Sequence, residues 1–349
     1  MIRVSIIIKT LNEESNISRA IESALQAVAA NGGEVIVADS GSTDRTVEIA
    51  MRYPILVVAL RDPKQRCCGI GPQLGFQHSK GEYVYVLDGD MELNAMFLQQ
   101  AIALLDREPS ISGVGGIVRE MRLENLEFEN RARHFLSRQV KDGSDVDCLT
   151  GGGLYRRAAI DEVSYLSDRN LHGFEEYDLG ARLRARGWRL VRLESHAVDH
   201  YSYELSTYQL LWYRIRAGRL LALGEILRAA FGGKYLRKVV VELRPIRFAV
   251  GVLLYWPIAG LLALAAPGIG WATLSLAFAA VLPVVAMTAR SGSLKAGAYS
   301  VAVWHLTAIN LLLGAVRTRK SPAAFIDSQI LRTAVDPAIP SKNPNRVPA

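Results

Sequence analysis

The chain has 349 residues, half of them hydrophobic, and a formal net charge of +7 at pH 7. This length leaves room for one large domain or two of ordinary size. Its three cysteines, Cys67, Cys68 and Cys148, have neither the number nor the spacing of a disulfide framework or a metal-binding motif. The composition therefore excludes a disulfide-stabilised secreted scaffold and a cysteine-ligated metal domain.

The amino-terminal part of the chain alternates between short apolar runs and amphipathic segments. We expect strands at residues 4–8, 34–38 and 55–60, each pair separated by a helix. Strands that alternate with helices form a mostly parallel sheet, and ligands bind such sheets at the carboxyl ends of the strands. Polar residues follow the first two strands, in segments 9–15 and 39–44.

Asn16, directly after the first segment, and Asp44, at the end of the second, are candidates for satisfying the first amides of the following helices. Neither strand is followed by the G-x-G-x-x-G pattern, and the chain has no G-x-x-x-x-G-K-[ST] loop. A dinucleotide-binding protein and a P-loop nucleotidase therefore lose their main sequence support.

Residues 83–90 form a β-branched and aromatic run that ends in Asp88, Gly89 and Asp90. Ionised carboxylates are costly inside an apolar core, so both acids should lie where the strand leaves the sheet, with a divalent cation as their natural partner. An ordinary hairpin turn at Asp88-Gly89 is the alternative interpretation.

Five motifs in this order resemble a family 2 glycosyltransferase of the GT-A fold. They are Lys9-Thr-Leu-Asn-Glu-Glu14, Asp39-Ser-Gly-Ser-Thr-Asp44, Lys80-Gly-Glu-Tyr83 with Leu87-Asp-Gly-Asp90, Thr150-Gly-Gly-Gly153, and Phe174-Glu-Glu-Tyr-Asp-Leu179. The resemblance covers roughly the first 220 residues. It implies an α/β, Rossmann-like sheet with flanking helices, followed here by a helical membrane region.

The resemblance also implies roles for individual residues. Glu176 takes the position of the catalytic base, and Asp90 and His200 those of metal ligands for Mg²⁺ or Mn²⁺. Glu175 and Asp178 are expected on the acceptor side. The residues expected to bind the nucleotide and donor sugar are Thr10, Asn12, Glu13, Asp39, Ser42, Gln73, Asp88 and Gly152.

Each of these assignments has a structural alternative. The acids of segment 175–178 lie just before an expected helix at residues 179–186, where they could simply interact with the helix dipole. His200 could be a structural histidine, and the glycines of segment 151–153 could form a turn without a ligand. Segment 39–44 could be a loop that caps a helix.

Two departures from the family pattern affect the expected activity. The usual arginine before Lys80-Gly-Glu-Tyr83 is missing, and Gln73 stands in segment 71–75 as a polar substitute. The Gln-x-x-Arg-Trp motif of processive synthases is also missing, since residues 209–214 read Gln-Leu-Leu-Trp-Tyr-Arg. A single sugar transfer is therefore expected rather than polymerisation.

The carboxyl-terminal part of the chain changes character. Segments 248–266, 269–289 and 296–316 contain no Asp, Glu, Lys or Arg, and each approaches or reaches the ~20 residues that cross a bilayer. The first two predict a transmembrane hairpin. If the third also crossed, Arg317 and Arg319 would lie outside, against the positive-inside preference, which a re-entrant or in-plane helix or an oligomeric contact would resolve.

These observations divide the chain into four regions. We expect a catalytic domain at 1–225, a basic amphipathic juxtamembrane segment at 226–248, transmembrane helices at 249–316 and a Pro-rich tail at 317–349. The second region has six basic residues against Glu242, and its position favours anionic lipid over nucleic acid. The amino terminus lacks a signal-peptide pattern, so the catalytic domain is expected in the cytoplasm, on the inner membrane.

The sequence thus predicts an inverting, metal-dependent glycosyltransferase of cell-envelope or exopolysaccharide synthesis. A UDP-sugar is the favoured donor, and a lipid-linked or glycan molecule is the expected acceptor, because an anchor concentrates the site near membrane-borne substrates. An oligomer is possible. The alternatives are a catalytically degenerate membrane scaffold and a nucleotidyltransferase of similar topology. A nucleotidyltransferase would require a basic Gly-rich loop after the first strand, where residues 9–14 are acidic.

Overall fold

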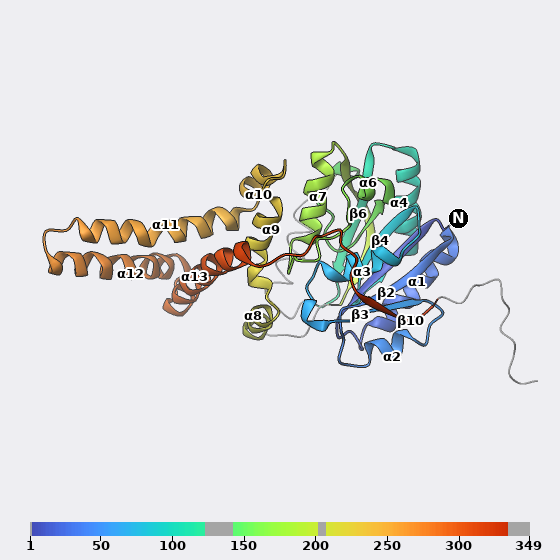
Figure 1. Cartoon of the computed structure of the whole chain (residues 1–349), viewed down its shortest axis with the longest axis horizontal. Coiled ribbons are helices and arrows are strands. Elements are labelled where there is room, and N and C mark those ends of the chain that lie inside the picture. The colour runs from blue at the N-terminus through green and yellow to red at the C-terminus, as the bar shows by residue number, and fades with distance from the viewer. Residues whose placement is uncertain (1, 123–141, 202–206, 334–349) are drawn as a thin grey trace, which may run out of the picture.

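The computed structural model describes residues 2–122, 142–201 and 207–333. Figure 1 shows an α/β domain built around one twisted sheet and a helical arm that extends away from it. The carboxyl-terminal segment returns from the arm to the far edge of the sheet.

The amino-terminal half of the domain is a parallel sheet, as expected from the alternation of strands and helices. Neighbouring strands pair in the order β3-β2-β1-β4. Their bounds are β1 (Val4–Thr10), β2 (Gly33–Asp39), β3 (Leu56–Leu60) and β4 (Tyr83–Asp88).

The remaining strands make the whole sheet mixed. Its order is β10-β3-β2-β1-β4-β8-β6-β9-β5, with β7 paired to β9. β10 and β8 run antiparallel to their neighbours β3 and β4, whereas β6 and β9 are parallel. The bounds are β5 (Met91–Leu93), β6 (Ile111–Glu120), β7 (Ser144–Asp145), β8 (Gly153–Arg156), β9 (Arg189–His200) and β10 (Ser328–Arg332).

Helices cover both faces of the sheet because successive strand side chains point to opposite faces. Ile6 and Ile8 of β1 belong to a core with α1 and α4, and Ile7 belongs to a second core with α3, α6 and α7. The bounds are α1 (Ile17–Asn31), α2 (Thr46–Ala50), α3 (Ile70–His78), α4 (Ala95–Arg107), α6 (Arg157–Glu162) and α7 (Glu175–Ala185).

Two local expectations were wrong. The helix expected at residues 179–186 begins earlier, at Glu175, because Phe174 adopts a left-handed backbone (φ 64°) and turns the chain into α7. Asn16 makes no side-chain cap to α1, since its amide donates to Glu13 instead. Asp44 does accept from the amides of Thr46 and Glu14, as expected.

The arm begins at the domain and contains three long apolar helices, each of which has the length and composition of a membrane span. At its base, Leu223 and Ile226 of α9 share a hydrophobic core with Tyr177 of α7. The bounds are α8 (Thr207–Arg216), η2 (Arg219–Leu221), α9 (Ala222–Ala230), α10 (Leu236–Glu242), α11 (Arg244–Leu264), α12 (Ile269–Ser291) and α13 (Leu294–Val316).

The first part of the expected Pro-rich tail packs on the catalytic domain, up to β10. Ser328 pairs with Leu60 of β3, and Arg169 donates to the carbonyls of Ala324 and Phe325. Most prolines of the Pro-rich tail lie beyond residue 333, outside the described residues, so this contact involves only the first part of the tail.

Candidate active site

The carboxyl ends of β1, β2 and β4 bring the first set of expected residues together. The parallel register places Thr10 beside Asp39, and Lys9 beside Asp88. Thr10 and Asp39 are buried, at 3% and 2% exposure, and their side chains are hydrogen-bonded at 3.2 Å. Residues from three separate segments therefore form one polar edge of the sheet.

Asp39 organises the loop that follows β2. Its carboxylate accepts hydrogen bonds from the amides of Gly41 and Ser42 and from the Ser42 hydroxyl. Asn12 ties the loop after β1 to the same segment: its amide donates to Ser42 Oγ, and its Oδ1 accepts from the Thr43 amide. These bonds pre-form the loop pair that the sequence analysis assigned to the nucleotide.

Glu13 lies against the turn between the two acids of the Asp-Gly-Asp motif. It is 7% exposed, and its amide donates to Thr46 Oγ1. A Cβ atom at Gly89 would lie 2.9 Å from Glu13 Cγ, so a larger residue would push the two loops apart. The glycine is thus needed for close packing of the site.

Asp90 and His200 meet at the start of β5 and the end of β9, where the sequence analysis placed a metal site. His200 Nε2 lies 3.3 Å from Asp90 Oδ2, and its Nδ1 lies 2.7 Å from Glu120 Oε2. Burial lowers the pKa of His200, but hydrogen bonds and charge from Asp90 and Glu120 outweigh it and raise this pKa to about 10. Glu120 was missed by the sequence analysis because the end of β6 carries no recognisable motif.

This donor set fits a divalent cation. A carboxylate and an imidazole are ligand types that Mn²⁺ and Mg²⁺ accept, and such ions usually take further ligands from a substrate phosphate. Within the described ranges, however, no three His, Cys, Asp or Glu side chains form a ready-made metal cluster. Asp90 and His200 could therefore hold the ion only together with oxygens from a substrate.

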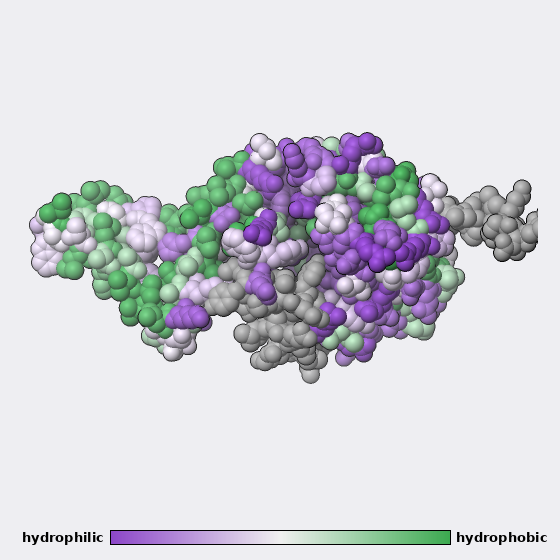
Figure 2. Space-filling model, turned by 90° about the horizontal axis from the view of Figure 1, so that it is seen from below, coloured by the Kyte–Doolittle hydropathy of each residue, from purple (hydrophilic) through white to green (hydrophobic). Residues whose placement is uncertain are grey.

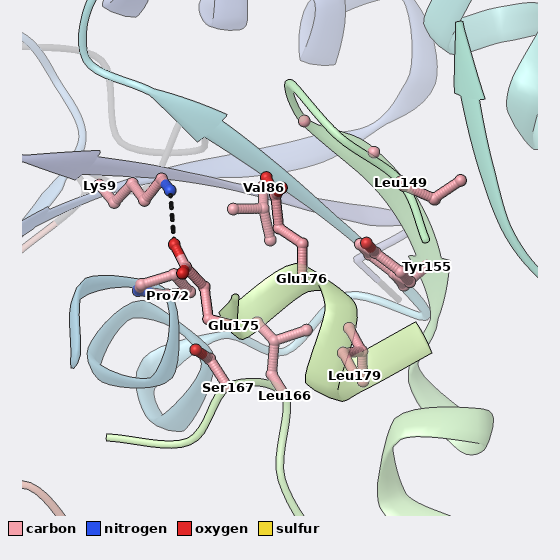
Figure 3. A pocket seen from close by; sticks show the side chains of 12 residues that line it. Lys9, Pro72, Val86, Leu149, Tyr155, Leu166, Ser167, Glu175, Glu176 and Leu179 are labelled. Atoms are coloured by element: carbon pink, nitrogen blue, oxygen red, sulfur yellow. Dashed lines mark hydrogen bonds and ion pairs between the residues drawn. The ribbon is translucent and has the colours of Figure 1, made fainter. Parts of the chain in front are cut away.

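Lys9 is a second residue that the sequence analysis missed. Its ammonium lies 3.1 Å from Asp88, at the end of β4. It also lies 3.4 Å from Glu175, at the start of α7 (Figure 3). Burial disfavours the charged form, but Asp88, Glu175 and Glu176 more than compensate and hold the pKa of Lys9 well above its usual range. Its place directly before Thr10, at the end of β1, was the available sequence signal.

Glu175 and Glu176 form the first turn of α7 and face a pocket below the strand ends. Val86, Gly152 and Tyr155 line the same pocket (Figure 3). Glu176 extends from α7 toward the end of β4, whereas Glu175 points to Lys9. The expected base and the expected acceptor-side acid thus lie at one cavity, which Lys9 also lines.

The glycines after Thr150 are required by the protein's own packing. Gly151 and Gly152 have left-handed backbones with φ of 76° and 91°. A Cβ atom on Gly152 would lie 2.9 Å from the Val86 carbonyl oxygen, and one on Gly151 would lie 2.4 Å from Val118. Gly152 nevertheless lines the pocket, so its backbone forms part of the cavity wall.

Two assigned residues are engaged elsewhere. Asp178 is completely buried, forms an ion pair with Arg182 at 2.7 Å and accepts from the Tyr235 hydroxyl, so its assignment to the acceptor side was wrong. Gln73 is 6% exposed, and its Oε1 accepts from the amides of Leu166 and Ser167. Gln73 therefore supports the loop before α7 and is not positioned as a stand-in for the missing arginine.

The comparisons with known proteins agree with this geometry. The family described as "Glycosyl transferase family 2" matches residues 5–164. A mannosyltransferase from Pyrobaculum calidifontis, solved in complex with GDP-Man and Mn²⁺, has a TM-score of 0.52 and 20% sequence identity. The alignment covers 90% of this chain and 86% of that one. At this identity the likeness shows the fold.

Two characterised relatives are more similar in sequence over shorter stretches. Undecaprenyl-phosphate 4-deoxy-4-formamido-L-arabinose transferase of Edwardsiella ictaluri is 25% identical over 178 residues, which cover 48% of this chain and 53% of that protein. The second relative, from Methanococcus voltae, is 24% identical over 216 residues, or 57% of this chain and 67% of that protein. It is a dolichyl N-acetyl-alpha-D-glucosaminyl phosphate 3-beta-D-2,3-diacetamido-2,3-dideoxy-beta-D-glucuronosyltransferase.

The chain thus spans about half the length of the first of these relatives. The match lies in the region that carries Asp39, Asp88 and Asp90, and the sheet has the GT-A arrangement seen in the solved mannosyltransferase. Residues 5–164 therefore match the family 2 glycosyltransferases, and the chain has a GT-A fold followed by three apolar carboxyl-terminal helices.

Proposed function

We propose that this enzyme transfers one sugar from a nucleoside diphosphate sugar to a hydroxyl group of a lipid-borne saccharide, with inversion at the anomeric carbon. The observation that carries the proposal is the position of Lys9, whose ammonium lies within 3.4 Å of both Asp88 and Glu175. This contact joins the strand ends expected to bind the donor to the helix that carries the expected base.

On the donor side, the loops after β1 and β2 would hold the nucleoside, with Asp39 accepting hydrogen bonds from it. A nucleotide would have to replace the bonds that Asp39 now accepts from Ser42 and Thr10. Asp90 and His200 would hold a divalent cation together with the diphosphate, and such a cation neutralises the charge that develops on the leaving group. UDP is our first candidate nucleotide, while the structural neighbour was solved with GDP-Man.

On the acceptor side, Glu176 would act as the general base. An acceptor hydroxyl has a pKa far above neutral, so it needs a carboxylate within hydrogen-bond reach. Glu176 takes the hydroxyl proton while the oxygen attacks C1 from the face opposite the diphosphate. The bond from C1 to the leaving oxygen breaks, and its electron pair leaves with the nucleoside diphosphate, which inverts the configuration.

The charge of the pocket favours a hydroxyl over a phosphate as the acceptor. Among the described residues that line the pocket are two carboxylates, Glu175 and Glu176, and one cation, Lys9, which also contacts Asp88. A phosphate monoester would meet this excess of negative charge, and it would need no base because it is already ionised. The names of both relatives refer to polyprenyl lipids, which supports a lipid-borne acceptor.

The helical arm would keep the site at the inner membrane, with the catalytic domain in the cytoplasm. The basic residues at the start of the arm, such as Arg237, Lys238 and Arg247, suit contact with anionic lipid headgroups. Confinement to a surface raises the effective concentration of a membrane-borne acceptor.

A donor-hydrolysis and transfer assay tests the proposal. The purified enzyme is incubated with Mn²⁺ and single radiolabelled UDP- and GDP-sugars, in liposomes that carry polyprenyl phosphate or a polyprenyl diphosphate saccharide. We expect sugar transfer to the saccharide lipid from either the UDP-sugars or the GDP-sugars. NMR of the product should show that the anomeric configuration of the new linkage is opposite to that of the donor. Transfer only to polyprenyl phosphate would overturn the proposed acceptor class, and retention of configuration would overturn the mechanism.

A further inference from the structure

The two ends of the helical arm attach to the same domain. At the base of the arm, Leu223 and Ile226 of α9 pack with Tyr177 of α7. After the arm, β10 pairs antiparallel with β3, with Ser328 opposite Leu60. A chain that leaves one side of a bilayer and returns to that side crosses it an even number of times. Of the three apolar helices in the described chain, at least one therefore cannot cross.

α11 and α12 have the geometry of a crossing pair. They run side by side as the extended part of the arm (Figure 1), and the Tyr255 hydroxyl donates to the Ala279 carbonyl at 2.7 Å. Figure 2 shows hydrophobic side chains gathered on this arm and hydrophilic ones on the catalytic domain. The arm is therefore the part of the molecule whose surface is suited to contact with the lipid bilayer.

α13 has a different placement. It starts beside the last turns of α12, where Gly297 packs against Thr288, and it ends against the domain, where Gly314 packs against Leu221 and Gly224. Both ends thus lie on the domain side of the α11–α12 hairpin. In Figure 1, α13 lies between the end of α12 and α9 and does not reach the tip of the arm.

The two faces of α13 differ in the way expected of a helix at a membrane surface. Ala308, Leu311 and Gly314 are buried against the base of the arm. The other face is apolar yet exposed, at positions spaced by three or four residues: Leu306, Ile309, Leu313 and Val316. A helix with one covered face and one exposed apolar face suits the boundary between headgroups and acyl chains.

The residues after α13 hold it to the catalytic side by ion pairs with buried carboxylates. Arg317 lies 2.8 Å from Glu225, and Arg319 pairs with Asp168. These two carboxylates are 3% and 0% exposed. If α13 crossed the bilayer, both carboxylates would remain buried without their arginine partners, which is strongly destabilising.

We propose that α11 and α12 cross the bilayer as a hairpin and that α13 lies along the lipid headgroup boundary on the catalytic side. The occupant of its exposed apolar face is the adjacent leaflet of the bilayer. This arrangement also removes the conflict with the positive-inside preference, because Arg290, Lys295, Arg317 and Arg319 then all lie on the catalytic side.

Cysteine accessibility in sealed inside-out membrane vesicles tests this topology without reference to activity. Single cysteines are introduced in the full chain at five exposed positions, and a membrane-impermeant maleimide-polyethylene glycol is added with or without detergent. The native chain is the background control, since burial raises the pKa of its three thiols. The positions are Gln26→Cys as catalytic-side reference, Pro267→Cys, Lys295→Cys, Thr318→Cys and Ser321→Cys.

We expect Lys295→Cys, Thr318→Cys and Ser321→Cys to label without detergent to the same extent as Gln26→Cys. Pro267→Cys should label only after detergent is added. Protection of both Thr318→Cys and Ser321→Cys would show that α13 crosses and would overturn the proposal. Protection of Lys295→Cys would mean that α12 does not cross, and free labelling of Pro267→Cys would mean that no hairpin crosses; either result also overturns it.

Discussion

The two sides of the active site are supported in different ways. The donor side rests on adjacent parallel strands, whose register alone places Thr10 beside Asp39 and Lys9 beside Asp88. The acceptor side rests on α7, which is held by residues far away in sequence. Glu242 of α10 binds Tyr177 and Arg184, and Arg319 pairs with Asp168 in the loop before α7.

This difference predicts that donor binding and sugar transfer can be separated. Changes in the arm or in the segment after α13 should disturb the position of Glu175 and Glu176 while leaving the strand ends in place. Changes at the strand ends should affect nucleotide binding first. The following predictions test this separation, from the largest expected effect to the smallest.

Replacement of Glu176 by Gln should have the largest effect on transfer. Without the base, we expect kcat to fall by roughly 10²–10⁴, the usual contribution of general base catalysis. Nucleotide affinity should stay unchanged, because the strand ends are intact. Steady-state kinetics and nucleotide titration on the same preparation measure both, with Glu162→Gln on the exposed surface of α6 as the matched control. Full activity of the Glu176 variant would remove this residue from the mechanism.

Replacement of Lys9 by Met should disturb both sides of the site together. Removing a cation beside carboxylates raises their pKa, so the acidic limb of the pH profile of kcat should move to higher pH. We expect a fall of roughly 10-fold or more in kcat/KM at neutral pH, in line with the loss of ~1.4 kcal/mol of transition-state stabilisation. Lys9→Arg should restore part of the activity, and Lys64→Met, on the exposed turn after β3, is the control. An unshifted pH profile would contradict the coupling role.

The site could be predicted from the sequence only where local pattern decides the structure. The strand ends with Asp39, Asp88 and Asp90 were found because an apolar run that stops at polar residues is visible in the chain itself. Glu120 lies at the end of β6 without such a signal, and it meets His200 only because β6 and β9 pair. The assignment of Asp178 failed because its partner Tyr235 is 57 residues away.

The same limit applies to the carboxyl-terminal segment. Nothing in its sequence predicted that Gln77 would bind both the amide and the carbonyl of Ile326. Such contacts between residues more than 200 positions apart leave no periodic pattern in the sequence. The apolar helices, in contrast, were evident from composition, because length without charge is itself the signal.

Replacement of Arg319 by Met should weaken the acceptor side and spare the donor side. The variant leaves Asp168 buried without its cation, so we expect a loss of about 3 kcal/mol in stability, the usual effect of breaking a buried pair. Transfer should fall while nucleotide affinity is kept. The double variant with Asp168→Asn should recover much of the stability in thermal melting, since the unpaired charge is then gone. Equal losses of stability in the single and the double variant would show that the ion pair between Arg319 and Asp168 does not stabilise the protein.

The Glu225 pair should produce the smallest effect, visible as a dependence of stability on pH. Burial raises the pKa of Glu225, but His172 and Arg317 outweigh it and hold this pKa below the usual value. The stabilisation is therefore complete above the unfolded pKa of about 4.3 and is lost as pH falls through the lower folded pKa. The melting temperature of the native enzyme should exceed that of Glu225→Gln at pH 7, and the gap should narrow in acid. A difference in melting temperature that grows in acid would contradict the lowered pKa of Glu225.

The most direct test of the transferase site is isothermal titration of the detergent-solubilised enzyme with UDP and with GDP, each with and without Mn²⁺. The account predicts that one nucleotide binds in a Mn²⁺-dependent manner and that Asp90→Asn abolishes this binding. Asp161→Asn, which removes an exposed carboxylate from α6, should bind like the native enzyme. Binding of neither nucleotide by folded native enzyme, or unchanged binding by Asp90→Asn, would contradict the proposed donor site.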